Sequence, residues 1–314
     1  MTIVTVTLNT SVDRTLEVPR FEVGGHLKGR AVRVQPAGKG VNVARCLARL
    51  GVPSVVTGLV GVRERELFRE ALAGTLAADE LVAVADATRT NTTILDPELG
   101  TNTHIRETGF QVQEAEFEAL CGKLRGLASA DALVTFCGSL PPGIAPRGIG
   151  RLLAACQERG ARVAADLNGS ELGVAAAARP LLIKPNVEEL AELLGRDLAS
   201  ATEAELLGAA RSLCDRVGTV LLTRGKDGAL AVSQGTALAG SAEVGAVRNT
   251  VGCGDAFLAG YLAGLWRGAA PEECLGQAVA CGAASALADA AGQIEPRQVA
   301  ELMERVEVRL PRVC

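Results

Sequence analysis

The chain has 314 residues, a length that suits one large α/β domain or two ordinary ones. Hydrophobic residues make up 48% of it but aromatic residues only 3%, so we expect an extensive core built mainly from Ala, Val and Leu. The 32 Lys and Arg against 36 Asp and Glu give a net charge of −4, without a basic block. This composition argues against a nucleic-acid partner.

The sequence carries no sign of a membrane or secreted protein. No run of about 18 apolar residues predicts a membrane span, and the opening MTIVTVTLNTSVD lacks the basic start of a signal peptide. The nine cysteines are scattered without a CxxC pair, and His26 and His104 lie far from any cysteine pattern. We therefore expect reduced thiols, a cytoplasmic location and no structural zinc.

Apolar runs suited to strands alternate with helical patterns along the chain. The predicted strands span 3–8, 54–60, 132–137, 162–167, 181–185 and 219–223. The predicted helices span 39–50, 64–76, 149–159, 187–194, 203–217, 254–267 and 271–287. This alternation is typical of a parallel sheet covered by helices on both faces. Because nothing marks a linker, we expect 1–314 to form a single domain.

Two stretches, 15–34 and 88–107, break this rhythm. Both alternate apolar with polar residues, as half-exposed antiparallel strands do, and neither contains a convincing helix. We expect them to pair into a small sheet beside the main domain. That sheet would serve either as a lid or as the contact of a homodimer.

The strongest local signal is NTVGCGDAFLAG, residues 249–260. Gly252 and Gly254 bracket Cys253 just before an apolar helix, which exposes backbone amides where the helix dipole favours an anion. A carboxylate here would compete with that anion, unless Asp255 is a base that deprotonates an attacking hydroxyl while the amides hold a phosphoryl group. The alternative is an ordinary N-cap aspartate.

A second signal is AGKGVNVA, residues 37–44. Gly38 and Gly40 flank Lys39 at a predicted helix start, and Asn42 follows on the first turn. Lys39 is suited to hold a phosphate while the glycine backbone approaches a sugar, although a solvent-exposed lysine is an equal alternative. The segment is neither a Walker A motif nor GxGxxG, and the absence of GxGxxG after the first strand argues against a Rossmann dehydrogenase.

Read together, these two segments resemble the signature regions of the ribokinase-like (PfkB) carbohydrate kinases. LNTSVD at 8–13, KPNVEE at 184–189 and TRGKDG at 223–228 are similar to further motifs of that family. The resemblance implies a ribokinase-like three-layer α/β/α sandwich with a mainly parallel central sheet and a small β-sheet lid. It also implies ATP-dependent phosphorylation of a sugar hydroxyl.

The resemblance assigns roles to individual positions. Asp255 would be the catalytic base, with Gly252, Cys253 and Gly254 supplying the amides. The implied sugar-binding residues are Asp13, Gly38, Lys39, Asn42, Arg89 and Ser139. The implied ATP-binding residues are Asn186, Glu189, Thr223, Gly225 and Gly228. Mg²⁺ would be held at Glu189, through water.

The segment FCGSLPPG at 136–143 resembles the branch of the family that phosphorylates sugar phosphates. That branch includes 1-phosphofructokinase, tagatose-6-phosphate kinase and the minor 6-phosphofructokinase. A phosphorylated substrate needs positively charged side chains around its phosphate, a set that we call the cationic cradle. Lys39 and Arg89 are candidates for it. On resemblance alone we favour conversion of fructose 1-phosphate to fructose 1,6-bisphosphate. The alternatives are the other two activities, a kinase of an unphosphorylated sugar or nucleoside, and a catalytically silent sugar-binding regulator.

Four features leave alternatives open. Asn249 stands where the family has aspartate, which weakens the inference of a monovalent cation such as K⁺. Cys253 replaces a common alanine, and its thiol is either reactive or simply small and buried. Asp166 ends a predicted strand, either near phosphate and metal or as a plain strand-end carboxylate. The small residues of 279–285 suit adenine binding and helix packing equally.

Overall fold

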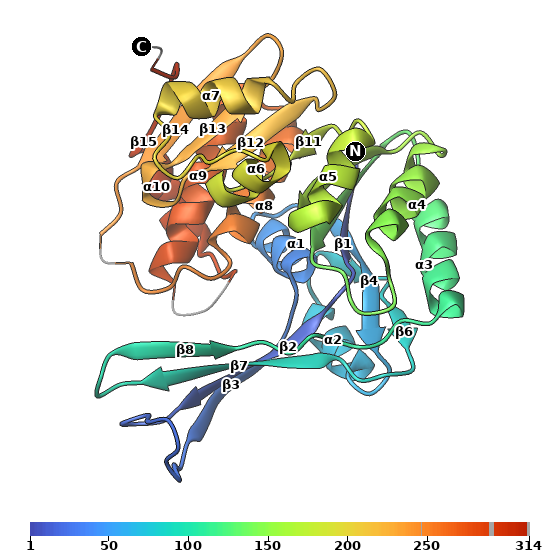
Figure 1. Ribbon diagram of the computed structural model, residues 1–314, viewed down its shortest axis with the longest axis vertical. Helices are drawn as coiled ribbons and strands as arrows, with labels where there is room; N and C mark the ends of the chain where they lie inside the picture. Colours follow the sequence, from blue (N-terminus) through green and yellow to red (C-terminus); the bar gives the residue numbers. More distant parts are fainter. Residues whose placement is uncertain (246, 289–291, 313–314) are drawn as a thin grey trace.

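The computed structural model describes residues 1–245, 247–288 and 292–312, which form an 11-stranded sheet, a smaller sheet and their covering helices (Figure 1). The strand order of the large sheet is β15-β14-β13-β12-β11-β10-β9-β1-β4-β5, with β6 paired to β4. Its strands are β1 (Thr2–Thr7), β4 (Ser54–Gly61), β5 (Ala77–Asp79), β6 (Val82–Val84), β9 (Ala132–Gly138), β10 (Arg162–Leu167), β11 (Leu182–Ile183), β12 (Thr219–Thr223), β13 (Ala229–Val232), β14 (Ala237–Ala242) and β15 (Val306–Arg309).

Pairing in the large sheet is parallel from β5 to β12 and antiparallel from β12 to β15. The helices are α1 (Lys39–Arg49), α2 (Arg65–Leu72), α3 (Glu114–Leu127), α4 (Pro146–Gln157), α5 (Gly169–Ala177), α6 (Val187–Leu194), α7 (Glu203–Arg211), α8 (Cys253–Arg267), α9 (Pro271–Leu287) and α10 (Pro296–Met303), with a 3₁₀ turn η1 (Gly225–Asp227).

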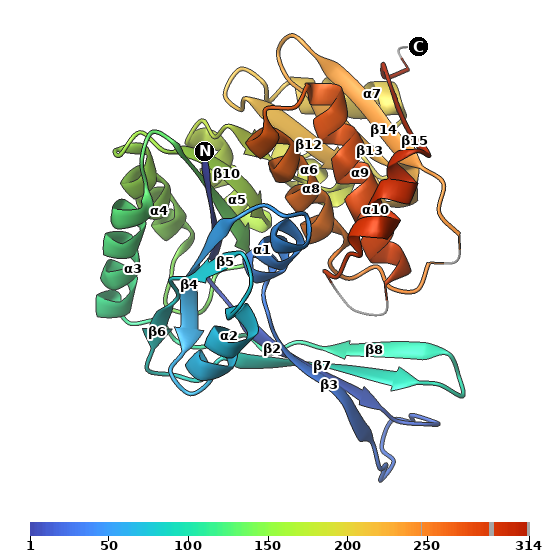
Figure 2. The same cartoon turned by 180° about the vertical axis from the view of Figure 1, so that it is seen from behind.

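Helices cover both faces of the large sheet because successive side chains of a strand point to opposite sides. In β1, Val4 and Val6 join the core beneath Leu120 of α3, whereas Ile3 joins the core beneath Leu47 of α1. Helices α3 to α7 lie over the first face, and α1 with α8 to α10 over the second (Figures 1 and 2). The predicted three layers with a mainly parallel sheet are confirmed.

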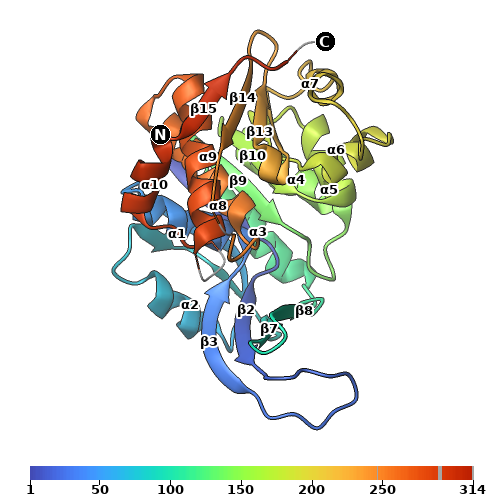
Figure 3. The ribbon, with the colours of Figure 1, turned by 90° about the vertical axis from the view of Figure 1, so that its left-hand side faces the viewer.

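The smaller sheet has the strand order β3-β2-β7-β8, formed by β2 (Ser11–Glu17), β3 (Arg30–Ala37), β7 (Arg89–Asp96) and β8 (Thr101–Ile105). The two stretches expected to pair therefore do so, and the sheet extends away from the main domain (Figure 3). The central pair, β2 with β7, is parallel and not antiparallel as expected. Both strands run outward from the main domain, so they pair in parallel.

Several elements were missed or mis-sized by the sequence patterns. The strands β13 to β15 and the helices α3, α5 and α10 were not predicted, and α7 ends at Arg211 instead of residue 217. Helix α5 is rich in alanine and glycine, so its sequence lacks a clear apolar stripe. Strands β13 to β15 are short, and they are recognisable only from the antiparallel partners that they find in the folded chain.

Within the described ranges, no helix is long and apolar enough to cross a membrane. The eight cysteines that the structure describes are all free; Cys253 is partly exposed and the other seven are buried. Cys314 lies outside the described residues.

Candidate active site

The site is built at the carboxyl ends of the parallel strands, where the first turns of α1 and α8 also lie. Helix α1 begins at Lys39 and packs against α8, which begins at Cys253. Strand β10 ends beside Asp166, and Lys184 follows β11. Ligands of open α/β sheets bind at this edge because loops from several strands converge there. The smaller sheet leaves the main domain at the same edge (Figure 1).

Asp255 is buried in the first turn of α8, with 5% of its surface exposed. Its Oδ2 accepts a 2.8 Å hydrogen bond from Nδ2 of Asn42 in α1. The N-cap of α8 is Gly252, whose φ of 82° is left-handed, and no side chain caps the helix. The alternative of an ordinary N-cap aspartate is therefore wrong. The carboxylate is held from a different helix and leaves the α8 amides uncapped.

Burial raises the pKa of Asp255 to about 6, and the negative charge of Asp166 acts in the same direction. The hydrogen bond from Asn42 and the positive charges of Lys39 and Lys184 oppose this shift. A carboxylate with such a pKa is mostly ionised at neutral pH yet more basic than an exposed aspartate. Both properties suit a group that accepts a proton from a hydroxyl.

Two lysines converge on one carboxylate oxygen beside Asp255. Lys39 Nζ lies 3.1 Å and Lys184 Nζ 3.3 Å from Oδ1 of Asp166, which is 1% exposed. Burial disfavours the charge of Lys39, but Asp166, Asp255 and Glu189 outweigh it and raise the lysine pKa. The site is thus a cluster of two cations and two carboxylates, buried except for the partly exposed Lys39, with a third carboxylate, Glu189, nearby. Asp166 is part of it and not a plain strand-end residue.

Lys184 was given no role by the sequence, although it stands in the KPNVEE segment. It is 4% exposed, and its Nζ would lie 3.3 Å from a Cβ placed on Gly254. Its ammonium group therefore sits against the glycine turn at the start of α8. The sequence did hold a signal for Lys184, because a lysine directly after a buried strand is rarely buried without a charged partner.

Two of the residues assigned to the sugar, Asp13 and Arg89, lie in the smaller sheet, near the starts of β2 and β7. Asp13 of β2 accepts hydrogen bonds from Ser11 Oγ at 2.9 Å and Asn91 Nδ2 at 3.0 Å. Arg89 of β7 donates to the backbone oxygens of Asn9 at 3.0 Å and Glu107 at 3.2 Å. Burial lowers the pKa of Arg89, and the negative charge of Asp13 counteracts this shift. The pairing of β2 with β7 therefore brings Asp13 and Arg89 together, and hydrogen bonds hold both side chains in place.

The glycine before Lys39 permits a close approach of the chain. Gly38 has a φ of 138°, and a Cβ there would lie 2.6 Å from Cγ2 of Thr7. On the other side, a Cβ on Gly138 would lie 3.8 Å from Cβ of Lys39. The end of β9 therefore adjoins Lys39, and partly buried Ser139 follows directly. This neighbourhood agrees with the predicted grouping of Lys39 and Ser139.

A cleft of about 610 Å³ opens from the start of α8 toward α9 and the β12–β13 loop. Its lining residues are Thr223, Gly225, Lys226, Gly228, Ala242, Glu243, Val244, Val247, Thr250, Cys253, Gly254, Phe257, Val279, Gly282, Ala283 and Ala286. The small residues of α9 therefore face a cleft. Helix packing also uses glycines, because a Cβ on Gly260 of α8 would lie 2.6 Å from Gln277 O. The helices α8 and α9 therefore pack closely, and adenine binding by the small residues of α9 stays a prediction.

The acidic residues fit a magnesium ion that keeps most of its water. No group of three or more His, Cys, Asp or Glu in the described part of the chain forms a metal cage. Glu189 Oε2 accepts from Asn186 N, and Asn186 Oδ1 accepts from Glu189 N, both at 2.8 Å. This reciprocal cap fixes both side chains at the start of α6. Mg²⁺ typically uses one or two carboxylates together with substrate phosphates, so the residues present are sufficient.

Residues 2–297 match the pfkB family of carbohydrate kinases, and the chain belongs to that family. The 1-phosphofructokinase of Rhodobacter capsulatus is 39% identical over 262 residues, which cover 83% of this chain and 82% of the relative. The 1-phosphofructokinase of Bacillus subtilis (strain 168) is 32% identical over 307 residues, covering 98% and 99%. The crystal structure of phosphofructokinase-2 from Escherichia coli in complex with potassium has a TM-score of 0.91 at 27% identity, covering 96% of this chain and 98% of that one.

These comparisons confirm the predicted family, the ribokinase-like fold and the enzyme class, an ATP-dependent sugar kinase. The alternative of a Rossmann dehydrogenase is wrong. The residue assignments within the site stay predictions.

Proposed function

We propose that this kinase transfers the γ-phosphoryl group of ATP to the free primary hydroxyl of fructose 1-phosphate, forming fructose 1,6-bisphosphate and ADP. The observation that carries the proposal is the placement of Asp255. It is a buried carboxylate with a raised pKa beside uncapped helix amides, next to Cys253 and Gly254, which line the α8–α9 cleft. The choice of sugar rests on relatives named 1-phosphofructokinase that match over most of both chains.

In the proposed reaction, the sugar hydroxyl oxygen bonds to the γ-phosphorus as the bond from that phosphorus to the β-phosphate oxygen breaks. Asp255 accepts the hydroxyl proton, and Asn42 holds its carboxylate in place. The backbone amides from Gly252 to Gly254, with the ammonium group of Lys184 beside them, stabilise the moving phosphoryl oxygens. The negative charge that develops in transfer is met by donors already in position.

The sugar phosphate would bind between the main domain and the smaller sheet. Asp13 would accept hydrogen bonds from sugar hydroxyls, while Lys39, Arg89 and Ser139 would hold the phosphate. For Lys39 this requires exchange of contacts, because its Nζ now bonds Asp166. The predicted sugar contact of Asn42 stays secondary, since its amide already bonds Asp255.

ATP would occupy the cleft between α8, α9 and the β12–β13 loop. Small side chains of α9 would face the adenine, and Thr223, Gly225 and Gly228 would lie next to the phosphates and ribose. Mg²⁺ would be positioned by Glu189 through water and would neutralise charge on the triphosphate. A monovalent cation such as K⁺ stays part of the proposal, although Asn249 replaces the family's aspartate and its Oδ1 accepts a 2.9 Å hydrogen bond from Val251 N.

We also assign residues 1–314 to one kinase domain, with lid segments at about 15–34 and 88–107. The smaller sheet starts at the sugar-binding residues, so its closure would exclude water from the transfer step. Val32, Val34 and Ile105 are exposed on its strands, at 42%, 55% and 52%. A homodimer through this sheet would cover such side chains. Sedimentation of wild type and a Val34→Lys variant tests this contact, and wild type that stays monomeric would refute it.

A substrate panel tests the proposed reaction. ADP release is measured with fructose 1-phosphate, fructose 6-phosphate, tagatose 6-phosphate, fructose and ribose. We expect the highest kcat/KM with fructose 1-phosphate. Preference for fructose 6-phosphate, the sugar bound in a similar structure of phosphofructokinase-2 from Escherichia coli, or for tagatose 6-phosphate would change the substrate. Preference for a sugar without phosphate would overturn the cationic cradle, and absence of ADP release with any sugar would overturn the activity.

A further inference from the structure

The loop between β12 and β13 forms one wall of the cleft proposed for ATP. Gly225, Lys226 and Gly228 line that cleft, and Arg224 N donates a 2.8 Å hydrogen bond to Gly228 O. Gly228 has a φ of 81°, and a Cβ there would lie 2.1 Å from Gly240 O. The neighbouring strand therefore restricts the loop closely on one side.

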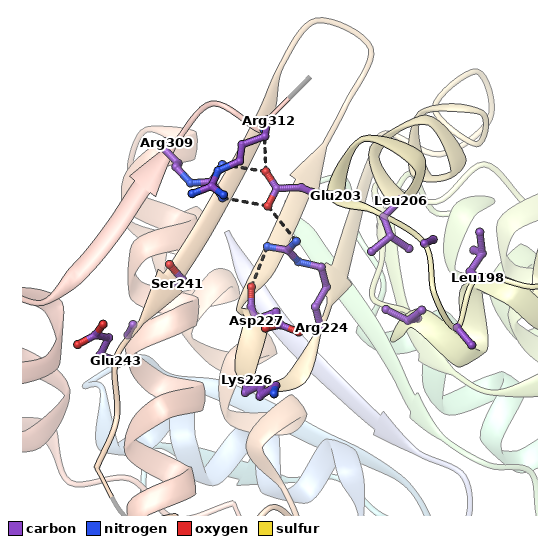
Figure 4. Close-up of a pocket in the computed structure, with 14 residues that line it drawn as sticks. Leu198, Glu203, Leu206, Arg224, Lys226, Asp227, Ser241, Glu243, Arg309 and Arg312 are labelled. Atoms are coloured by element: carbon purple, nitrogen blue, oxygen red, sulfur yellow. Dashed lines mark hydrogen bonds and ion pairs between the residues drawn. The ribbon is translucent and has the colours of Figure 1, made fainter. Parts of the chain in front are cut away.

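On the other side, the loop is held by the side chain of Arg224, which is 9% exposed. Its Nη2 donates to the backbone oxygen of Asp227 at 2.8 Å, inside the loop itself. Its Nη1 donates to Oε2 of Glu203 at 3.0 Å (Figure 4). Arg224 thus joins the backbone of the loop to the first residue of α7.

Glu203 is the centre of a larger network that reaches the C-terminal strand. Arg309 of β15 donates to both of its carboxylate oxygens, at 2.8 and 2.9 Å, and Arg312 N donates to Oε1 at 2.7 Å (Figure 4). The hydrogen bond from Arg309 is the main reason that the pKa of Glu203 falls to about 2. Two parallel hydrogen bonds between an arginine and a carboxylate fix the orientation of the carboxylate as well as stabilising the pair. The start of α7, the β12–β13 loop and the C-terminal strand are therefore tied together at one side chain.

We propose that Glu203 is a positioning residue for ATP: held by Arg309, it fixes Arg224 and thereby the loop that lines the nucleotide cleft. Glu203 does not line that cleft, so it would act only through the loop. A loop that is already ordered loses less conformational entropy when ATP binds. The inference rests on the proposed function in taking ATP as the ligand of this cleft.

The test is the dissociation constant of ATP with Mg²⁺, measured by calorimetry on the whole chain, together with steady-state kinetics. For Glu203→Gln we expect Kd and KM for ATP to rise about tenfold, the effect of one lost coupling contact, with kcat and the KM for sugar phosphate unchanged. The matched control is Asp79→Asn. Asp79 is 13% exposed and accepts from Arg65 at 2.5 Å, on the edge strand β5.

The control should lower thermal stability without changing ATP affinity. An unchanged Kd in Glu203→Gln, or an equal rise in Asp79→Asn, would overturn the proposal. Arg309→Met is the second variant, because Arg309 donates to Glu203 and not to the loop. It should also weaken ATP binding, and the double variant should bind no more weakly than Glu203→Gln. Additive losses of ATP affinity in the double variant would show that Glu203 and Arg309 act separately. That result would contradict the proposal that Arg309 acts through Glu203.

The binding measurement also separates this inference from the proposed reaction. If wild type binds ATP but phosphorylates none of the sugars, the proposed substrate fails while the role of Glu203 is still decided by the Kd values.

Discussion

Asn42 and Asp255 are 213 positions apart in sequence, yet a 2.8 Å hydrogen bond joins Nδ2 of the first to Oδ2 of the second. The bond connects the first turns of α1 and α8, which pack side by side on one face of the sheet. It stabilises the ionised form of a carboxylate that burial would otherwise protonate more strongly. The geometry of the proposed base therefore depends on both signature segments.

Asp255→Asn should lower kcat about 10²- to 10⁴-fold, the usual scale for a lost general base. The amide cannot accept the hydroxyl proton, but it is nearly the same size as the carboxylate, so substrate binding should change little. Steady-state kinetics with a calorimetric Kd for ATP measure both quantities. Near-normal turnover would exclude Asp255 as the base.

The same variant should be more stable than wild type at alkaline pH. The pKa of Asp255 is raised from 3.8 to about 6 in the folded chain, so the unfolded chain releases its proton first as pH rises. Stability from this group is complete below 3.8 and is lost as pH rises through about 6. At pH 8 we expect Asp255→Asn to gain about 1–3 kcal/mol in free energy of unfolding, shrinking toward zero at pH 4.

Urea unfolding of both proteins at the two pH values measures this difference. A variant less stable than wild type at pH 8 would show that the ionised carboxylate stabilises the fold, contrary to the expectation.

The acid limb of the activity profile should follow the ionisation of Asp255. A base must be deprotonated, so kcat/KM should fall as pH drops below about 6. In Asn42→Ala the carboxylate loses a hydrogen bond to its charged form, and the limb should move to higher pH by about one unit. Profiles of log kcat/KM from pH 5 to 9 measure the shift, and a limb that stays in place would separate Asn42 from the titration.

Lys39→Ala and Arg89→Ala should mainly weaken binding of the phosphorylated sugar. Each removes one cation from the proposed cradle, so we expect KM for fructose 1-phosphate to rise about tenfold or more. The KM for ATP and the weak affinity for unphosphorylated fructose should change much less. Lys123→Ala is a suitable control, because this lysine pairs with Glu80 on the surface. Normal sugar-phosphate affinity in either variant would refute its part in the cradle.

Gly254→Ala should separate catalysis from stability. Alanine favours the helix by about 1 kcal/mol over glycine, but its Cβ would lie 3.3 Å from Lys184 Nζ and require that ammonium group to shift. We expect stability to be kept or raised while kcat falls about tenfold, because donors around the phosphoryl group act only when well placed. Gly122→Ala in α3, where a Cβ meets nothing within 4 Å, is the matched control and should leave kcat unchanged. An unchanged kcat in Gly254→Ala would show that Lys184 needs no close approach there.

The resemblance of the segments 37–44 and 249–260 to known motifs implied the family. Local patterns predicted the parallel sheet and the helix starts beside Asp255 and Lys39, because apolar periodicity defines strands and helices and glycines before a helix leave its amides open. The positions of β10, α6, β12 and α9 were predicted at their observed bounds for the same reason.

Only the folded chain shows the long-range relationships. The convergence of Lys39 and Lys184 on Asp166, the raised pKa of Asp255 and the parallel pairing of β2 with β7 all join residues distant in sequence. The role of Glu203 is proposed from contacts of the same kind. Burial and charge partners, which set the pKa and orientation of each group, are properties of the packed structure and leave no local pattern to be recognised.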